Sequence, residues 1–172
     1  LNAKYFISPK GKVQQNFEAL GNAWFVSKIN IVENADVEIR SLDDFVPSYI
    51  AFVDQRFRDI IFSNYNNLDS SASSFEDSFD HSNSKILLTE YQPNYLKYSS
   101  VSENSGIGIF SEVYYDKGWN AYINGKLQPH FRANYILRGM FIPKGKNIIE
   151  FKFEPSVFKN GEKISFACSS IL

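Results

Sequence analysis

Residues 108–155 read GIFSEVYYDKGWNAYINGKLQPHFRANYILRGMFIPKGKNIIEFKFEP, a series of short strands with alternating apolar residues, joined by turn sequences. In 146–153, Ile149, Phe151 and Phe153 alternate with charged residues. Because successive side chains of a strand point to opposite faces, one face of this strand is predicted to be core and the other exposed. The stretch therefore predicts antiparallel sheet.

Turn signals separate the predicted strands. Asn124-Gly125 is the strongest of them, since a type I′ hairpin turn needs positive φ at both central residues. Pro143-Lys144-Gly145, Asp116-Lys117-Gly118 and Asn160-Gly161 are further predicted reversals. The strands expected between such signals are 4–7, 23–32, 49–53, 85–91, 94–102, 106–115, 119–123, 126–131, 134–142, 146–153 and 162–168. This even spacing predicts an all-β fold, a jelly-roll-like antiparallel β-sandwich formed by residues 1–172 as one domain.

Two segments differ from this pattern. Asn34 is a predicted N-cap of one short helix near residues 35–42, which Pro47 separates from the next strand. Residues 63–84 contain eight Ser, four Asn and four acidic residues, with no Lys or Arg, and predict a polar surface loop. Calcium binding by Glu76 and its acidic neighbours is the alternative, but their spacing does not match an EF-hand, so no metal is predicted.

Bulk composition narrows the class of protein. The 172 residues are 44% hydrophobic and 16% aromatic, as in a folded aromatic-rich domain. A net charge of −1 argues against a nucleic-acid partner. No window approaches 18 uninterrupted apolar residues, so the sequence predicts no membrane span, and it shows no signal peptide. The first residue is Leu1, so we expect a piece of a longer protein.

No motif for catalysis is present in the sequence. His81, His130 and Cys168 lie near no nucleophile elbow, metal-binding helix or paired-Cys motif. Cys168 with either histidine could be drawn as a dyad, but a buried structural Cys is the simpler interpretation. We therefore predict no catalytic residue and no cofactor in this domain.

A cluster of aromatic, amide and basic residues is the strongest ligand candidate. Aromatic rings stack on sugar faces, whereas Asn and Arg bind hydroxyls or phosphate. Residues 117–163 also carry nine Lys or Arg against three Glu, which could face anionic headgroups or a lipid-linked phosphate, or form an ordinary solvated face. The alternative for the cluster is that its rings fill the core. The candidate ligand residues are Trp119, Tyr122, Arg132, Asn134 and Arg138.

Several phrases of the sequence cover most of the chain outside residues 60–84 and read LNAKYFI, ALGNAWFV, KILLTEYQPNYLKYSS, FSEVYYDKGWNAYINGK, ANYILRGMFIPKGK and IEFKFEP. Together they resemble the C-terminal extracytoplasmic portion of the YfhO family of bacterial membrane proteins. These are structural phrases, so the resemblance identifies no catalytic residue.

The resemblance implies a function for the parent protein. YfhO-like proteins look like GT-C glycosyltransferases, which take sugars from polyprenyl-phosphate carriers at the outer face of the cytoplasmic membrane. This chain would then be a non-catalytic extracytoplasmic domain, periplasmic in a Gram-negative cell. It would assist glycosyl transfer by acceptor binding or cleft shaping. Its expected partners are the membrane-spanning part of the same polypeptide and a cell-envelope glycan or lipid-linked sugar. The alternative is a free-standing carbohydrate-binding or adhesion-type sandwich module.

Overall fold

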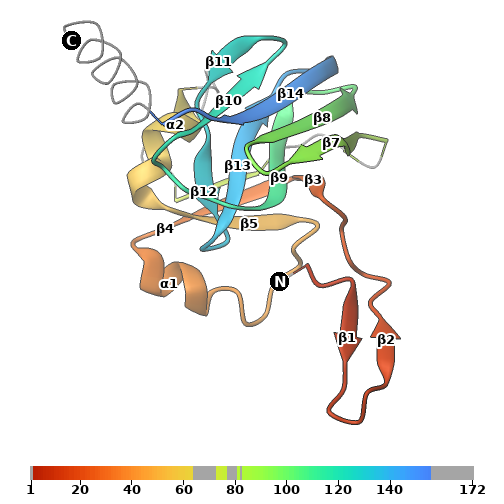
Figure 1. The fold of residues 1–172 in the computed structure, drawn as a ribbon. Coiled ribbons are helices and arrows are strands. Elements are labelled where there is room, and N and C mark those ends of the chain that lie inside the picture. Colours follow the sequence, from red (N-terminus) through yellow and green to blue (C-terminus); the bar gives the residue numbers. More distant parts are fainter. Residues whose placement is uncertain (1, 64–72, 77–80, 82, 156–172) are drawn as a thin grey trace, which may run out of the picture.

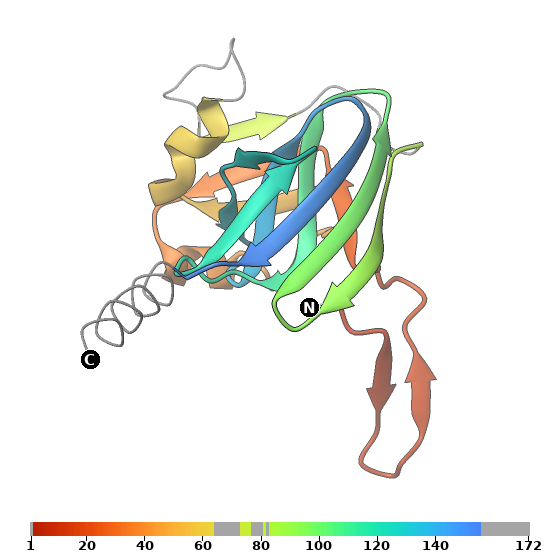
Figure 2. The same ribbon diagram turned by 45° about the horizontal axis from the view of Figure 1, so that its top comes forward.

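Two antiparallel sheets form the body of the molecule (Figures 1 and 2). The computed structural model describes residues 2–63, 73–76, 81 and 83–155. The first sheet has the order β11 (Lys126–Gln128), β10 (Trp119–Ile123), β14 (Gly145–Phe153), β8 (Tyr95–Ser102) and β7 (Lys85–Gln92). The second has the order β12 (Phe131–Ala133), β13 (Leu137–Ile142), β9 (Gly106–Val113) and β3 (Ala23–Val26). The predicted fold class, an all-β antiparallel sandwich, is confirmed.

An aromatic core fills the space between these sheets. Tyr98, Phe110 and Phe151 are fully buried, and their rings meet edge to face at centroid distances of 4.9, 5.0 and 6.1 Å. Edge-to-face contacts at this range are favourable because the positive ring edge meets the negative face of its neighbour. The alternation expected in 146–153 is confirmed at the centre of β14, where Ile149 and Phe151 are buried.

A third sheet covers the other face of the four-stranded sheet, so that the structure has three layers. It consists of β5 (Ile50–Asp54), β4 (Lys28–Val32) and β6 (Ser74–Glu76), and β4 and β5 run parallel. The helices α1 (Ala35–Arg40), η1 (Gln55–Phe57) and α2 (Arg58–Phe62) belong to this layer. A second hydrophobic cluster, separate from the aromatic core, joins it to β9, β12 and β13.

The predicted short helix is confirmed as α1. Asn34 is its N-cap, and its side-chain oxygen accepts hydrogen bonds from the backbone N–H groups of Asp36 and Val37 at 3.1 and 3.0 Å. These bonds satisfy two N–H groups that have no partner within the helix. The helices η1 and α2 were not predicted from the sequence.

Three predicted strands have different bounds in the structure. The expected strand 23–32 is divided at Ser27 into β3 and β4, which belong to different sheets. The expected strand 126–131 is likewise divided, because β11 ends at Gln128 and Phe131 begins β12. Asn134 and Tyr135, predicted to begin a strand, have φ values of 49° and 70° and instead form the turn that joins β12 to β13.

Some predictions fall on or beside residues that the structure does not describe. Within 63–84, residues Ser74–Glu76 form β6, which pairs with β4, so this part is a strand and not a loop. Most of that segment lies outside the described residues, as do the predicted strand 162–168, the Asn160-Gly161 turn and Cys168.

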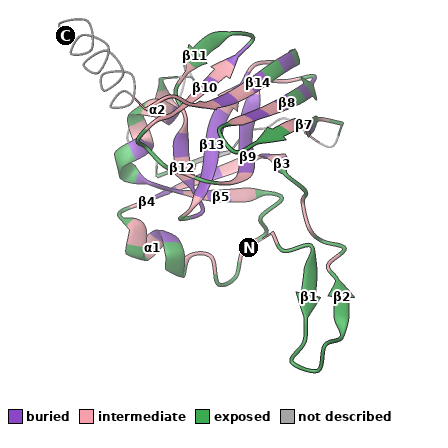
Figure 3. Cartoon of the chain, in the orientation of Figure 1, coloured by how far each residue is buried: buried purple, intermediate pink, exposed green. Residues whose placement is uncertain are grey.

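The strands β1 (Tyr5–Ile7) and β2 (Val13–Gln15) form a hairpin that projects from the sandwich (Figure 1). All residues of both strands are exposed, and Figure 3 shows the hairpin as an almost uninterrupted exposed segment. None of the helices within the described ranges has both the length and the apolar character that crossing a bilayer requires.

Candidate functional site

The five residues predicted to bind a ligand lie in three different surroundings. Arg138, on β13, is only 3% exposed, and its guanidinium carbon lies 4.3 Å from the centroid of the Trp119 ring. It also lies 5.1 Å from the Phe151 ring, and its Nε donates a hydrogen bond to the carbonyl of Val113 at 3.0 Å. Trp119 and Arg138 therefore contact each other at the border of the aromatic core, as the core interpretation expects.

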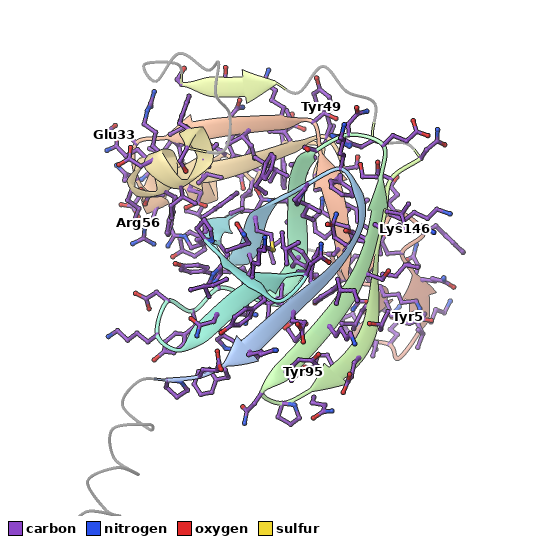
Figure 4. The ribbon with its side chains drawn as sticks, turned by 90° about the horizontal axis from the view of Figure 1, so that it is seen from above. Tyr5, Glu33, Tyr49, Arg56, Tyr95 and Lys146 are labelled. Carbon is purple, nitrogen blue, oxygen red and sulfur yellow. The ribbon has the colours of Figure 1, made fainter. Side chains whose placement is uncertain are left out.

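Tyr122 lies instead in a network of polar side chains on the open face of the five-stranded sheet. Its hydroxyl donates to Glu154 at 2.6 Å, and the Lys152 ammonium lies 5.0 Å from its ring centroid. The hydrogen bond to Glu154 raises the pKa of Tyr122. Along the same face, Tyr95 donates to Glu150 at 2.7 Å. Figure 4 shows Tyr95 at this side of the molecule, away from Arg56 and Glu33.

Arg132 and Asn134 lie in a third place, where β12 and its turn contact α1 and β5. Arg132 Nη2 donates to Glu38 Oε2 at 2.6 Å, and Asp54 Oδ2 lies 3.5 Å from the same nitrogen. The backbone N–H of Tyr135 donates to the other oxygen of Glu38 at 2.9 Å. Arg132 and Arg138 are opposite each other in the β12–β13 pair, yet their guanidinium groups have separate partners.

Asn134 fastens this turn to β5 through two hydrogen bonds. Its backbone N–H donates to the carbonyl of Phe52 at 2.8 Å, and its side-chain oxygen accepts from the Phe52 N–H at 2.9 Å. The Asn134 backbone N–H and side-chain oxygen thus bind the backbone groups of Phe52 that a neighbouring strand would otherwise bind at this edge of β5. The left-handed backbone at Asn134 suits this residue, because Asn tolerates positive φ better than most side chains.

Glu38 is the acidic residue at the centre of the cluster that it forms with Arg132 and the Tyr135 N–H. Its side chain is fully buried, and burial raises the pKa of its carboxyl, while the Tyr135 N–H and Arg132 lower it. A buried carboxyl with a cation and a backbone N–H on its two oxygens has few acceptor positions left. The cluster therefore joins segments of the chain and leaves little capacity for a ligand.

A cavity of about 690 Å³ opens next to this turn, and Asn134 forms part of its wall. This volume lies within the range of small-molecule sites, roughly 300–1,000 Å³. The wall combines aromatic and apolar side chains with several amides and one carboxylate. The lining residues include Asn2, Asn16, Glu18, Trp24, Phe45, Val46, Pro47 and Asn134.

Trp24 shapes the cavity from β3. Its indole Nε1–H donates to the carbonyl of Pro47 at 2.7 Å, which holds the segment 42–48 against the sheet. The ring is thereby fixed at a wall of the cavity, with its polar atom already satisfied. Asn2 and Asn16 reach the cavity from the base of the β1–β2 hairpin.

Sequence reasoning found one residue of this cavity, Asn134, and missed the others. The sequence predicts a strand at Trp24 and no element over most of residues 42–48, which follow the predicted helix. The wall is assembled from three segments that are distant in sequence, and no local pattern relates them. The aromatic and amide residues near Trp24 in the sequence are the available signal, but the same residues also fit an ordinary strand end.

Few titratable side chains line the cavity in the described part of the chain. No group of three or more His, Cys, Asp or Glu that could hold a metal ion occurs among the described residues. Glu18 is the sole carboxylate among the residues that line the cavity in the described part of the chain. Glycoside hydrolysis usually needs two carboxyls that face each other.

The sandwich, the cavity beside Trp24 and the projecting hairpin together define an all-β domain. Residues 63–165 match the family described as "Bacterial membrane protein YfhO". Since this match covers more than half of the chain, the protein belongs to the YfhO family. The predicted resemblance is thus confirmed.

Comparison with one curated relative shows what share of a longer protein the chain matches. Over 57 residues the chain is 40% identical to the uncharacterized protein YfhO of Bacillus subtilis strain 168. This alignment spans 33% of the chain and 7% of the relative, so the chain covers a small part of that protein. No solved structure matches the chain.

Proposed function

We propose that this chain is a non-catalytic extracytoplasmic domain of a YfhO-like membrane protein and that its cavity binds the acceptor glycan of a glycosyl transfer. The observation that supports the proposal most is the cavity of about 690 Å³ beside Trp24 and Asn134. Family membership supplies the membrane context. The transfer chemistry itself would belong to the membrane-spanning part of the same polypeptide.

The chemistry of the cavity wall suits a saccharide. The C–H face of a sugar ring packs on aromatic side chains such as Trp24 and Phe45, and its hydroxyls exchange hydrogen bonds with amides. The side-chain amides of Asn2 and Asn16 lie at the wall, where each uses one of its two N–H groups in a hydrogen bond to a backbone carbonyl, of Gly21 and Ala3 respectively. An uncharged or weakly charged glycan fits this wall better than a phosphate does, because Glu18 would repel an anion.

This proposal relocates the ligand site that the sequence suggested. Trp119, Tyr122, Arg132 and Arg138 have partners within the protein, whereas Asn134 borders the cavity. A free-standing carbohydrate-binding module has less support, because the family is one of membrane proteins.

Glycan titration tests the proposal directly. The probes are neutral hexose and N-acetylhexosamine oligosaccharides, followed by amide NMR shifts and tryptophan fluorescence. We expect dissociation constants from about millimolar to tens of micromolar, ~4–7 kcal/mol. Shifts should gather at 16–24, 42–48 and 134.

Two variants sharpen this experiment. Trp24→Tyr keeps an aromatic ring at the wall but shortens it, and we expect binding to weaken about tenfold, ~1.4 kcal/mol. Tyr91→Ala, an exposed aromatic on β7, is the matched control and should bind as the wild type does. Equal affinities of Trp24→Tyr and wild type, or no binding of any probe, would remove the cavity from the proposed function. Turnover of a glycosyl substrate by the purified chain would contradict its non-catalytic part.

A further inference from the structure

The β1–β2 hairpin is a sheet of two strands with no third strand beside it in the described part of the chain. An isolated two-stranded hairpin is marginally stable in water, because it has no core to bury. This hairpin nevertheless carries large apolar side chains that are more than half exposed to solvent. An isolated hairpin with exposed apolar side chains indicates a surface that another molecule covers when the protein functions.

The apolar side chains of the hairpin are concentrated on one face. Ile7 is directly opposite Val13, and Tyr5 is opposite Gln15, so all four side chains lie on the same side of the hairpin. Tyr5, Ile7 and Val13 are 52%, 74% and 65% exposed. The opposite face carries Phe6 and Gln14. We call Tyr5, Ile7 and Val13 the apolar face.

The charge around the apolar face has a single sign. Residues 1–17 contain three lysines, Lys4, Lys10 and Lys12, and no Asp or Glu. Lys10 and Lys12 belong to the turn at the tip, next to Ile7 and Val13, and Lys4 lies 5.7 Å from the Tyr5 ring centroid. The whole chain has a net charge of −1, so the hairpin is a basic segment of a nearly neutral protein, as residues 117–163 also are.

The hairpin is fixed to the body at its base. Asn16 donates from its backbone N–H to the Lys4 carbonyl at 2.8 Å and from its side chain to the Ala3 carbonyl at 2.9 Å. Asn2 accepts from the Leu20 N–H at 2.6 Å and donates to the Gly21 carbonyl. The apolar face is therefore presented at a set position relative to the sandwich.

We propose that the β1–β2 hairpin binds the surface of a bilayer that contains anionic lipids, with the apolar face in the interfacial region and the lysines at the headgroups. Apolar and aromatic side chains with Lys around them are the composition that interfacial segments use. Lipid phosphates complement the three lysines, since the negative surface of a membrane attracts basic residues. A second copy of the chain would instead bring like charges together.

Vesicle flotation tests this surface with the whole 172-residue chain. The vesicles are phosphatidylcholine alone or phosphatidylcholine with phosphatidylglycerol, at low salt. We expect binding to the anionic vesicles that falls as salt is added, and weak binding to phosphatidylcholine. The double variant Lys10→Gln/Lys12→Gln should bind about 30-fold more weakly, which is ~1 kcal/mol per lysine.

Matched variants distinguish vesicle binding by the hairpin from binding by the rest of the surface. Ile7→Ser/Val13→Ser should lose binding to both compositions, whereas Leu127→Ser/Ile148→Ser, on exposed positions of β11 and β14, should bind as the wild type does. Lys126→Gln/Lys144→Gln is the control for charge. The four positions of the apolar variants are exposed, so each variant is expected to fold, and circular dichroism checks that it does.

A fluorescent reporter measures insertion. In Ile7→Trp, the emission of the new side chain should shift to the blue with anionic vesicles and be quenched by brominated lipids, whereas Leu127→Trp should show neither effect. Absence of binding, or equal binding of hairpin and control variants, would overturn the proposal. So would a concentration-dependent dimer that Ile7→Ser/Val13→Ser abolishes, because a second copy would then be the occupant. None of these results depends on whether the cavity binds a glycan.

Discussion

His130 is a titratable side chain placed among rings. Its ring centroid lies 5.4 Å from that of Tyr114 and 5.9 Å from that of Phe151. Its Nε2 is buried and has no hydrogen-bond partner among the described residues. Burial, together with the positive charge of Arg138, lowers the pKa of His130 from 6.5 to about 4. The neutral imidazole is therefore the form that the fold accepts.

The stability of the protein should fall in mild acid because of this residue. The unfolded chain takes up the proton of His130 near pH 6.5, but the folded chain takes it up only near pH 4. Protonation therefore favours unfolding across this window, and the loss between pH 7 and pH 5 is about 2 kcal/mol. Urea unfolding at the two pH values measures it. His130→Gln cannot titrate and should lose less stability over the same interval; an equal loss would show that other groups are responsible.

At this scale the sequence was informative about residue chemistry and much less about position. The five ligand candidates were chosen for stacking rings and forked donors, and the structure does use these properties. The Arg138 guanidinium lies against the Trp119 ring, and Arg132 binds the Glu38 carboxylate through one nitrogen, Nη2. Their partners, Glu38 and Phe151, come from distant segments. Whether a donor meets a ligand or a buried carboxylate depends on that distant pairing, which local spacing does not encode.

The β10–β11 hairpin shows how far turn chemistry alone specifies an element. Ile123 pairs with Lys126, so Asn124 and Gly125 are the two loop residues, with φ values of 50° and 79°. Positive φ at both positions is what the predicted type I′ turn requires. Asn124 adds tertiary bonds, since its side-chain oxygen accepts from the Ile148 N–H at 2.9 Å.

Gly125→Val should destabilise the protein by about 1–2 kcal/mol. No atom lies within 4 Å of a Cβ built at this position, so the cost comes from the backbone and not from a clash. Chemical denaturation measures the change in the free energy of unfolding. Gly125→Asn is the matched control, because Asn accepts positive φ, and it should lose much less. Similar losses for the two variants would mean that the left-handed backbone is not what the turn requires.

The strands predicted at 85–91, 94–102, 106–115 and 119–123 agree with β7, β8, β9 and β10 within two residues, because turn signals separate them. The strand expected at 23–32 was wrong in one respect, because the chain changes sheet at Ser27. Its apolar residues fit one long strand equally well. The parallel pairing of β4 with β5 depends on the intervening helix α1 and on contacts with a separate layer, which strand periodicity does not report.

For the molecule as a whole, Glu38 connects the third layer to the sandwich. It lies on α1 and binds Arg132 of β12 and the Tyr135 N–H. Glu38→Gln would place an amide donor against one of the two donors that Glu38 now binds, Arg132 Nη2 or the Tyr135 N–H, and would remove the charge that balances Arg132. We expect a loss of about 2–3 kcal/mol in the free energy of unfolding. The exposed Glu33→Gln, also in this layer, is the control and should change stability little. A near-zero effect of Glu38→Gln would show that the hydrophobic cluster alone joins the layers.

The change of sheet at Ser27 has a consequence for how the molecule unfolds. Val26 lies in the second hydrophobic cluster, Phe25 in the aromatic core, and Ile29, two residues beyond Ser27, again in the second cluster. Two adjacent residues of one extended segment, Phe25 and Val26, thus belong to different cores, and a strand cannot slide or detach in one layer without disturbing the other. We therefore expect the layers to unfold together as one cooperative unit, without a partly unfolded state in which the outer sheet separates from an intact sandwich.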